Sequence, residues 1–137
     1  MNTAFLLLNT AKNLKYGLNR TLETYNITAQ QWAVIQRLSQ VANENITAQQ
    51  LSQDLEMDKQ TISEIVKRLE SKQLLIREKN PNDRRAYQLK LSKIGIQALT
   101  QYQEVSQTVL EAFLSPLTAA EQAQLQKLLF KLQASDV

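Results

Sequence analysis

The side chains in this chain that are best suited to chemistry are polar and charged, and they occur in two short stretches. They are Gln60, Thr61, Ser63, Glu64, Lys67, Arg68, Asp83, Arg84 and Arg85. Glutamine can pair with the edge of an adenine, glutamate can accept a hydrogen bond from cytosine, and threonine can touch a thymine methyl group. Lysine and arginine neutralise backbone phosphates. These residue types indicate a surface for double-stranded DNA.

A helix that begins after Asp58 is expected to position the first stretch. Its apolar residues recur at i, i+3, i+4 and i+7, which places them on one buried face: Ile62, Ile65, Val66 and Leu69. Gln60, Glu64 and Lys67 then point to the opposite face. Asp58 is a suitable N-cap, because its carboxylate can accept the free N–H groups of the first turn. The helix therefore presents a polar face for base reading.

A hairpin is expected to position the second stretch. After Leu74 the apolar period changes from 3.6 to about 2, so that Tyr87, Leu89 and Leu91 alternate with polar residues. The turn between the strands is predicted to span residues 80–85, with Pro81 at its second position. A helix suits the major groove, and a hairpin tip beside it can reach the backbone or the minor groove. Together the two elements predict a winged helix.

The distribution of charge supports this interpretation more than the total charge does. The net charge is +3, whereas residues 59–93 alone contain ten basic and four acidic residues. The positive charge therefore coincides with the predicted winged helix, as expected for a DNA-binding surface. Two plainer interpretations remain open: Asp83-Arg84-Arg85 as a solvated turn, and the polar residues from 60 to 68 as an ordinary exposed helix face.

Helices are also expected at residues 4–24, 29–40 and 48–55, from Ser92 to Pro116, and after Thr118. The string Asn-Ile-Thr-Ala-Gln-Gln occurs at 26–31 and again at 45–50. In both copies, and at Thr118 with Glu121, the spacing is that of a capping box, which starts a helix. Recurrence of this start signal explains the repeat better than duplication of a unit does. The short connection between the helix at 48–55 and Asp58 predicts a helix-turn-helix.

The terminal helices carry more apolar surface than one winged helix can cover. The residues expected to pack against a second copy of the chain are Phe5, Leu8, Leu18, Leu125, Leu128, Leu129 and Leu132. A two-fold dimer would bind a pseudo-palindromic site with half-sites about one helical turn apart. Tyr16, Trp32 and Tyr102 are either core residues or the lining of a ligand cavity.

The composition excludes most catalytic chemistry. The chain contains no histidine and no cysteine, and it has no glycine-rich phosphate loop. Neither an enzyme nor a metal or cofactor site is therefore expected. Any effector should be a small apolar or aromatic molecule bound between the terminal helices and the reader domain. No stretch approaches the roughly 20 apolar residues that span a bilayer, so the protein is expected to be cytoplasmic, without a membrane partner.

Three motifs resemble those of the MarR (multiple antibiotic resistance regulator) family of winged helix-turn-helix transcriptional regulators. They are Leu69-Glu70-Ser71-Lys72-Gln73-Leu74-Leu75, Asn80-Pro81-Asn82-Asp83-Arg84-Arg85-Ala86 and Leu91-Ser92-Lys93-Ile94-Gly95. The family usually shows L-E-x-K-G-L-I, then a D-x-R-A or D-x-R-S wing, then L-T-x-x-G. Two residues depart from this pattern. Gln73 replaces the usual glycine, so the helix end must use another conformation or strain a glutamine, and Glu64 stands where basic or neutral polar side chains are common.

The resemblance covers the whole chain and implies a mainly α fold with a small two-stranded β-hairpin. One domain would span residues 1–137, with a DNA-binding winged helix at about 28–92 and dimerisation helices at about 1–25 and 93–137. The implied function is that of a homodimeric, sequence-specific regulator, expected to be a repressor at a pseudo-palindromic operator. By the same resemblance, Arg85 enters the minor groove while Asp83 positions an arginine. The alternative is a winged helix that contacts only other proteins.

Overall fold

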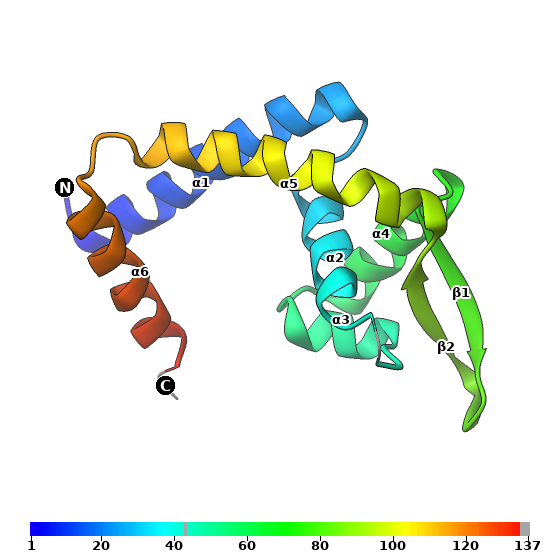
Figure 1. Ribbon diagram of the computed structural model, residues 1–137. Helices are drawn as coiled ribbons and strands as arrows, with labels where there is room; N and C mark the ends of the chain where they lie inside the picture. Colours follow the sequence, from blue (N-terminus) through cyan, green and yellow to red (C-terminus); the bar gives the residue numbers. More distant parts are fainter. Residues whose placement is uncertain (43, 135–137) are drawn as a thin grey trace.

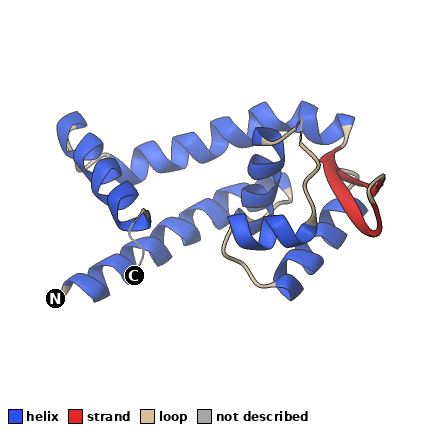
Figure 2. Ribbon diagram, turned by 90° about the horizontal axis from the view of Figure 1, so that it is seen from below, coloured by secondary structure: helices blue, strands red, loops and turns tan. Residues whose placement is uncertain are grey.

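The elements of the chain follow the predicted order. The computed structural model describes residues 1–42 and 44–134, with the backbone alone at 83–86. Its elements are α1 (Thr3–Leu22), the short 3-10 helix η1 (Glu23–Tyr25), α2 (Ala29–Gln40), α3 (Ala48–Asp54), α4 (Lys59–Ser71), β1 (Leu75–Asn80), β2 (Asp83–Leu91), α5 (Lys93–Leu114) and α6 (Ala119–Gln133). In Figure 1, α2, α3, α4 and the hairpin form one lobe. Helices α1 and α5 extend from it side by side, with α6 at their far end (Figures 1 and 2). This is the predicted winged helix-turn-helix architecture.

The predicted capping boxes start three of the helices. The Gln31 N–H donates to Thr28 Oγ1 at 3.0 Å, and the Thr28 N–H donates to Gln31 Oε1 at 3.2 Å. The same reciprocal pair is formed where α3 begins at Thr47 and where α6 begins at Thr118. Each pair satisfies N–H groups that have no partner within the helix, so these starts depend on residues only three positions apart.

The first helix ends earlier than predicted. Residues 23–25 form η1 instead of continuing α1 to residue 24. The chain then reverses at Asn26, which adopts the left-handed conformation with φ of 63°, and the Ile27 N–H donates to the Leu22 carbonyl at 3.2 Å. Asparagine tolerates this conformation better than most residues, so the turn into α2 is made locally.

The core lies in the lobe and includes the lobe ends of α1 and α5. Its most completely buried side chains are Leu22, Val34, Ile35, Leu51, Ile62 and Leu69. Trp32 of α2 and Tyr102 of α5 meet edge to face with ring centroids 5.9 Å apart, and both are buried. These two aromatics are therefore core residues. Tyr16 is 66% exposed and lies outside the cluster.

The turn of the hairpin is shorter than predicted. Strand β1 ends at Asn80 and β2 begins at Asp83, so Pro81 and Asn82 alone connect the strands, instead of residues 80–85. The Asn82 N–H donates to Asn80 Oδ1 at 2.9 Å, a local bond of the kind that asparagine makes in turns. The pairing register shifts just below the tip, between Lys79 and Asn80. The residues predicted as an open tip therefore belong by their backbone to β2.

The predicted alternation along β2 is only partly right. Leu89 is buried, but Gln88 is also buried and Tyr87 is 45% exposed. The Leu89 N–H donates to the Ile46 carbonyl at 2.8 Å, so the segment before α3 lies against the middle of β2. Contact with the lobe therefore encloses both faces of β2 at this point, whereas the period-two pattern predicts one buried and one solvated face.

The junction of α4, the hairpin and α5 depends on two backbone features. Gln73 adopts the left-handed conformation with φ of 63°, and the following Leu74 N–H donates to the Leu69 carbonyl at 2.9 Å. The Leu74 carbonyl in turn accepts the Ser92 N–H at 2.9 Å. A Cβ atom on Gly95 would lie 2.2 Å from that same carbonyl oxygen. Of the two alternatives for the residue that replaces the usual glycine, the structure shows the strained one: Gln73 itself adopts the left-handed conformation. Gly95 permits a close approach of α5 to the end of α4.

Candidate nucleic-acid interface

Helix α4 has one face in the core and the opposite face in solvent. Ile62, Val66 and Leu69 are at most 2% exposed, so the helix is held firmly against the lobe. Of the six predicted reader residues on this helix, Gln60, Glu64, Lys67 and Arg68 are exposed, and Thr61 and Ser63 are half-buried. The arrangement leaves one polar helix face in solvent, and a major groove is wide enough to admit an α-helix.

The first turn of α4 is fixed by Asp58. The Thr61 N–H donates to Asp58 Oδ1 at 2.7 Å. Hydrogen bonds from Thr61 stabilise the carboxylate and hold the pKa of Asp58 below its usual value. The negative charge also suits the positive end of the helix dipole. Since Gln60 and Thr61 lie in this turn, the cap fixes the backbone that carries two of the predicted reader residues.

Helix α3 supports α4 from behind. The turn between them has Glu56 in the left-handed conformation with φ of 53°, and the Met57 N–H donates to the Ser52 carbonyl at 3.1 Å. The Ser52 hydroxyl donates to the Met57 carbonyl. On its other side, α3 is joined to α2 by an ion pair of 3.0 Å between Arg37 and Asp54. These bonds complete the predicted helix-turn-helix.

The base of the hairpin is joined directly to α4. Arg77 Nε of β1 lies 2.6 Å from Glu70 Oε1 near the end of α4, and the Arg77 guanidinium lies 5.9 Å from the centre of the Tyr87 ring. Across the hairpin, Lys90 Nζ and Glu78 Oε2 are 2.9 Å apart. Exposed pairs of this kind contribute little to stability, about 0–1 kcal/mol each. The Arg77–Glu70 pair links the hairpin to α4, whereas the Lys90–Glu78 pair links the two strands of the hairpin to each other.

The three predicted wing residues, Asp83, Arg84 and Arg85, belong to β2 by their backbone, and their side chains lie outside the described residues. Their role stays a prediction. Among the described residues, the recorded ion pairs involve neither Lys67 nor Lys79. Both side chains are exposed, so their charges are available to phosphates beside the helix and near the hairpin tip.

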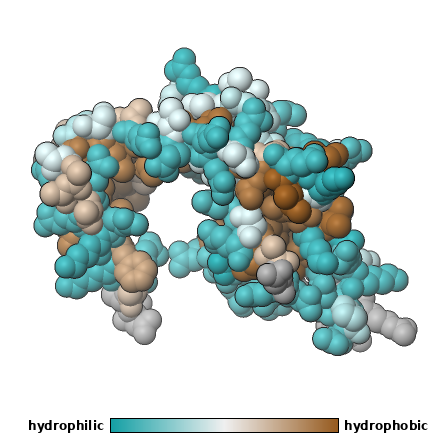
Figure 3. Space-filling view, viewed as in Figure 1, coloured by the Kyte–Doolittle hydropathy of each residue, from teal (hydrophilic) through white to brown (hydrophobic). Residues whose placement is uncertain are grey.

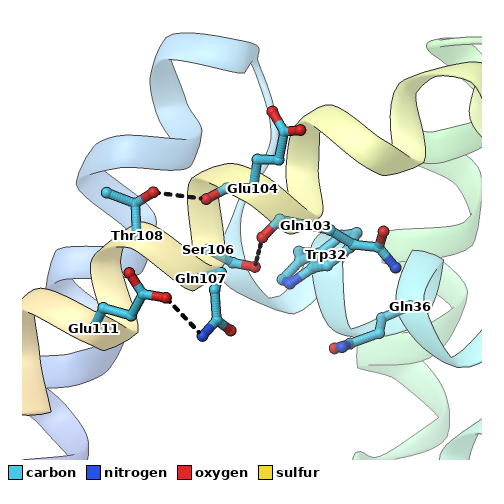
Figure 4. Close-up of a pocket in the computed structure, with 8 residues that line it drawn as sticks. All are labelled: Trp32, Gln36, Gln103, Glu104, Ser106, Gln107, Thr108 and Glu111. Carbon is cyan, nitrogen blue, oxygen red and sulfur yellow. Dashed lines mark hydrogen bonds between the residues drawn. The ribbon is translucent and has the colours of Figure 1, made fainter.

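A groove of about 730 Å³ lies between α2 and α5 (Figure 4). It is lined by Trp32, Gln36, Gln103, Glu104, Ser106, Gln107, Thr108 and Glu111. The Gln107 amide donates to Glu111 Oε1 at 3.2 Å, and the Ser106 hydroxyl donates to the Gln103 carbonyl at 3.1 Å. Of the described residues that line it, Trp32 alone is aromatic. The groove is therefore polar and is not the three-aromatic cavity considered from the sequence.

Most of the predicted dimerisation residues lie exposed on α1 and α6. Phe5, Leu8, Leu128, Leu129 and Leu132 are between 44% and 74% exposed, and Leu125 is half-buried. Leu18 instead packs against the core of its own chain. The other predicted residues therefore leave apolar surface on α1 and α6 at least partly exposed to solvent.

The sequence analysis missed three members of this surface: Leu6, Leu7 and Phe130, which are 49%, 48% and 75% exposed. Leu6 and Leu7 line an apolar groove of about 880 Å³ between α1, α5 and α6. Figure 3 shows apolar residues on the inner side of the hollow between α6 and the lobe. The sequence does contain a signal for Leu6 and Leu7. Four consecutive apolar residues, from Phe5 to Leu8, make a helix apolar on every side, so some of them must remain outside the core.

In the part of the chain that the structure describes, no group of three or more acidic side chains could hold a metal ion. None of the described helices is long and apolar enough to cross a membrane.

Comparison with known proteins identifies the family. Residues 27–87 match the model of the MarR family. The structure of the reduced form of MarR from E. coli is similar over 96% of this chain and 96% of that chain, with a TM-score of 0.82 and 30% sequence identity. The chain belongs to the MarR family.

Two further relatives extend the MarR-family comparison. A mutant of MarR from E. coli in complex with operator DNA is 29% identical, has a TM-score of 0.84, and is matched over 94% of this chain and 91% of that chain. A putative transcriptional regulatory protein for the hcr operon of Thauera aromatica is 31% identical over 94 residues, which are 69% of this chain. The match spans 57% of the length of that relative.

Proposed function

We propose that the protein is a homodimeric transcriptional regulator that binds double-stranded DNA at specific sequences and represses by occluding a promoter. The observation that carries this proposal is the free polar face of α4, capped by Asp58 and joined to the hairpin through Glu70 and Arg77. A rigid helix of this kind with a wing beside it suits one major groove and the adjacent backbone. The similarity to a MarR structure bound to operator DNA supports the same use of the fold.

The residues of α4 divide by position into base readers and phosphate contacts. Gln60, Thr61 and Glu64 lie in the first two turns, where a recognition helix enters the groove. They are proposed to contact base edges, with Ser63 beside them. Lys67 and Arg68 lie further along the helix and are proposed to contact phosphates, which position the protein without reading sequence.

The wing is proposed to add a minor-groove contact. Arg85 would enter the groove, Asp83 would position an arginine, and Arg84 would contact the backbone. A narrow minor groove concentrates negative potential, which attracts a guanidinium group. The location of all three residues at the start of β2, directly after the tip, supports this role.

The terminal helices are proposed to form the dimer. In this division, residues 28–92 read DNA, whereas residues 1–25 and 93–137 bring two copies together. The exposed leucines and phenylalanines of α1 and α6 support the proposal, because soluble monomers rarely expose apolar patches of this extent. Two copies related by a two-fold axis would place two reader helices on a pseudo-palindromic operator, and would raise specificity toward the factor of about 10³–10⁷ that regulators need.

Selection of bound duplexes from a random pool tests sequence-specific binding. An inverted repeat with half-sites about one helical turn apart is expected. With the selected duplex, Arg85→Ala is expected to weaken binding by about 1–3 kcal/mol at matched salt. Gln60→Ala should relax the preference at one or two base positions, whereas Lys67→Ala should weaken all sequences about equally. If duplex DNA is not bound in a salt-dependent manner, the winged helix is a protein–protein module instead.

Light scattering tests the dimer. The native chain of 15.7 kDa is expected to show twice that mass at micromolar concentration. Replacing both Leu128 and Leu129 with glutamate should give monomers and abolish tight DNA binding, while Gln124→Glu on the same helix should leave both unchanged. A native monomer that binds its selected site tightly would refute the dimeric architecture.

A small-molecule effector is also proposed to release the DNA. The sequence predicts that the effector is apolar or aromatic. The groove beside Trp32 suits such a molecule poorly, because the other described residues that line it are polar. A titration of the DNA complex with apolar aromatic compounds tests that class directly. Release at a concentration that leaves the protein folded would support it.

A further inference from the structure

A second pocket, of about 550 Å³, lies where the last turns of α1, the start of α2 and the C-terminal half of α4 meet. Among the described residues, three basic side chains line it, Lys15, Arg68 and Lys72, together with one acidic side chain, Glu23. The other lining residues are Asn19, Asn26, Ile27, Thr28, Gln30 and Gln31. Ile27 is 3% exposed, so the other side chains that line the pocket are polar or charged, and together they carry an excess of positive charge.

Lys72 enters this pocket without a carboxylate partner. Its Nζ donates to Gln31 Oε1 at 2.9 Å and to the Asn26 carbonyl, both of which are uncharged. Among the described residues no ion pair is recorded for Lys72, Arg68 or Lys15. Partial burial, together with the nearby charge of Arg68, lowers the pKa of Lys72. The positive charges of Lys72 and Arg68 repel each other, and an anion between them would relieve this repulsion. The anion would also accept a hydrogen bond from the third N–H group of the Lys72 ammonium.

The start of α2 is not itself the binding group. The Ala29 N–H, which heads the helix, already donates to Asn19 Oδ1 at 2.7 Å, and the Gln31 N–H donates to Thr28 Oγ1. The Asn19 side chain therefore turns its oxygen to the helix, and its NH₂ group remains a donor for the pocket. Recognition would come from three cations and neutral amide donors.

Arg68 links the pocket to the reader helix. At 100° per residue, Arg68 and Lys72 lie about 40° apart around α4, on the flank that faces α1 and α2. Gln60, Glu64 and Lys67 lie on the central exposed line of the helix. A ligand that binds Arg68 and Lys72 would therefore hold the end of α4 against α1 and would withdraw Arg68 from phosphates.

We propose that this pocket binds a small hydrophilic polyanion, a molecule with two or three carboxylates or with a phosphate ester, and that its binding weakens the hold on DNA. The regulatory half of this inference rests on the function proposed above. A phosphate of the DNA backbone could occupy the pocket instead, because it presents the same kind of negatively charged oxygen atoms. One observation argues against DNA as the source. Lys15 belongs to the C-terminal half of α1, a segment that lies on the opposite side of the lobe from α3 and the hairpin tip (Figure 1).

Calorimetry on the free protein tests the site. Citrate and glucose 6-phosphate are the probes, glucose is the neutral control, and the ionic strength is held constant because salt screens such contacts. Saturable binding of citrate, glucose 6-phosphate or both is expected, with none of glucose. Lys15→Gln should weaken it about ten-fold or more, the equivalent of about 1.4 kcal/mol for a lost charge contact. Lys12→Gln, an exposed lysine on the same helix that does not line the pocket, should change it less than two-fold.

If Lys15→Gln and Lys12→Gln lose affinity for the anion equally, the binding is nonspecific attraction to positive charge and the proposal is overturned. The absence of saturable binding of either anion would also overturn it. Lys72→Met removes a second cation from a different helix, and it should abolish binding while the melting temperature confirms that the variant is folded. These measurements need no DNA, so they stand apart from the test of sequence-specific binding.

A second measurement, with the selected duplex, tests the regulatory half. The anion that binds should weaken DNA binding by the native protein, and Lys15→Gln should remove this effect while it retains DNA affinity within about two-fold. If Lys15→Gln instead weakens DNA binding when no anion is present, the pocket serves a DNA phosphate and the proposal is wrong. If the anion binds but leaves DNA affinity unchanged, the regulatory half is refuted.

Discussion

Gln73 offers a direct test of the strain at the end of α4, because replacing it with glycine should stabilise the protein. Its φ of 63° lies in the left-handed region, which costs a residue with a Cβ about 1–2 kcal/mol. Glycine does not have this cost, but its greater freedom in the unfolded chain offsets about 0.5–1 kcal/mol. The side chain of Gln73 is exposed, and its carbonyl, which accepts the Ser92 hydroxyl, is retained in the variant. The expected net gain is therefore about 0.5–1 kcal/mol in the free energy of unfolding, or about 2–5 °C in melting temperature.

Urea unfolding at one fixed protein concentration measures this gain, since the stability of a dimer would depend on concentration. Two controls share the position. Gln73→Asn should lie between the native protein and Gln73→Gly, because asparagine tolerates the left-handed conformation, and Gln73→Ala should show no gain because alanine keeps the Cβ. If Gln73→Gly is no more stable than the native protein, or if Gln73→Ala is stabilised equally, the strain argument is wrong.

Three other substitutions test the packing and the cap of the lobe. Gly95→Ala should destabilise by about 1–3 kcal/mol in the same urea assay, because the new Cβ would lie 2.2 Å from the Leu74 carbonyl oxygen and α5 would have to move. Leu22→Ala should cost about 2–5 kcal/mol, because Leu22 is fully buried where α1 enters the core. Asp58→Ala should lower the melting temperature at pH 7, and Asp58→Asn should retain the cap. Because the folded pKa of Asp58 is lowered, its stabilisation is present above the usual value of 3.8 and is lost as the pH falls through the lowered pKa. The deficit of Asp58→Ala should therefore shrink in acid, and a deficit that is independent of pH would contradict a role for the charge.

The order of the elements and most of their boundaries could be predicted because the signals are local. A capping box involves residues three positions apart, and an apolar stripe repeats within two turns, so the starts at Thr28, Thr47 and Thr118 follow from the sequence alone. The reader face of α4 is predictable for the same reason, since burial of Ile62 and Leu69 leaves the opposite side in solvent. The failures at the hairpin tip and at Gln88 come from contacts between segments, which no short pattern describes.

Local patterns therefore suffice to predict which helices form, which residues stand on the polar face of α4, and that the terminal helices carry surplus apolar surface. They do not predict which of these side chains meet. In the folded chain Lys72 contacts Gln31 across 41 positions of sequence, Leu18 packs against the core, and Leu7 is exposed. The physical reason is that a helix or strand limits a side chain to one side of its own element. The partner on that side depends on how separate elements pack, and this packing minimises the exposed apolar area of the whole chain.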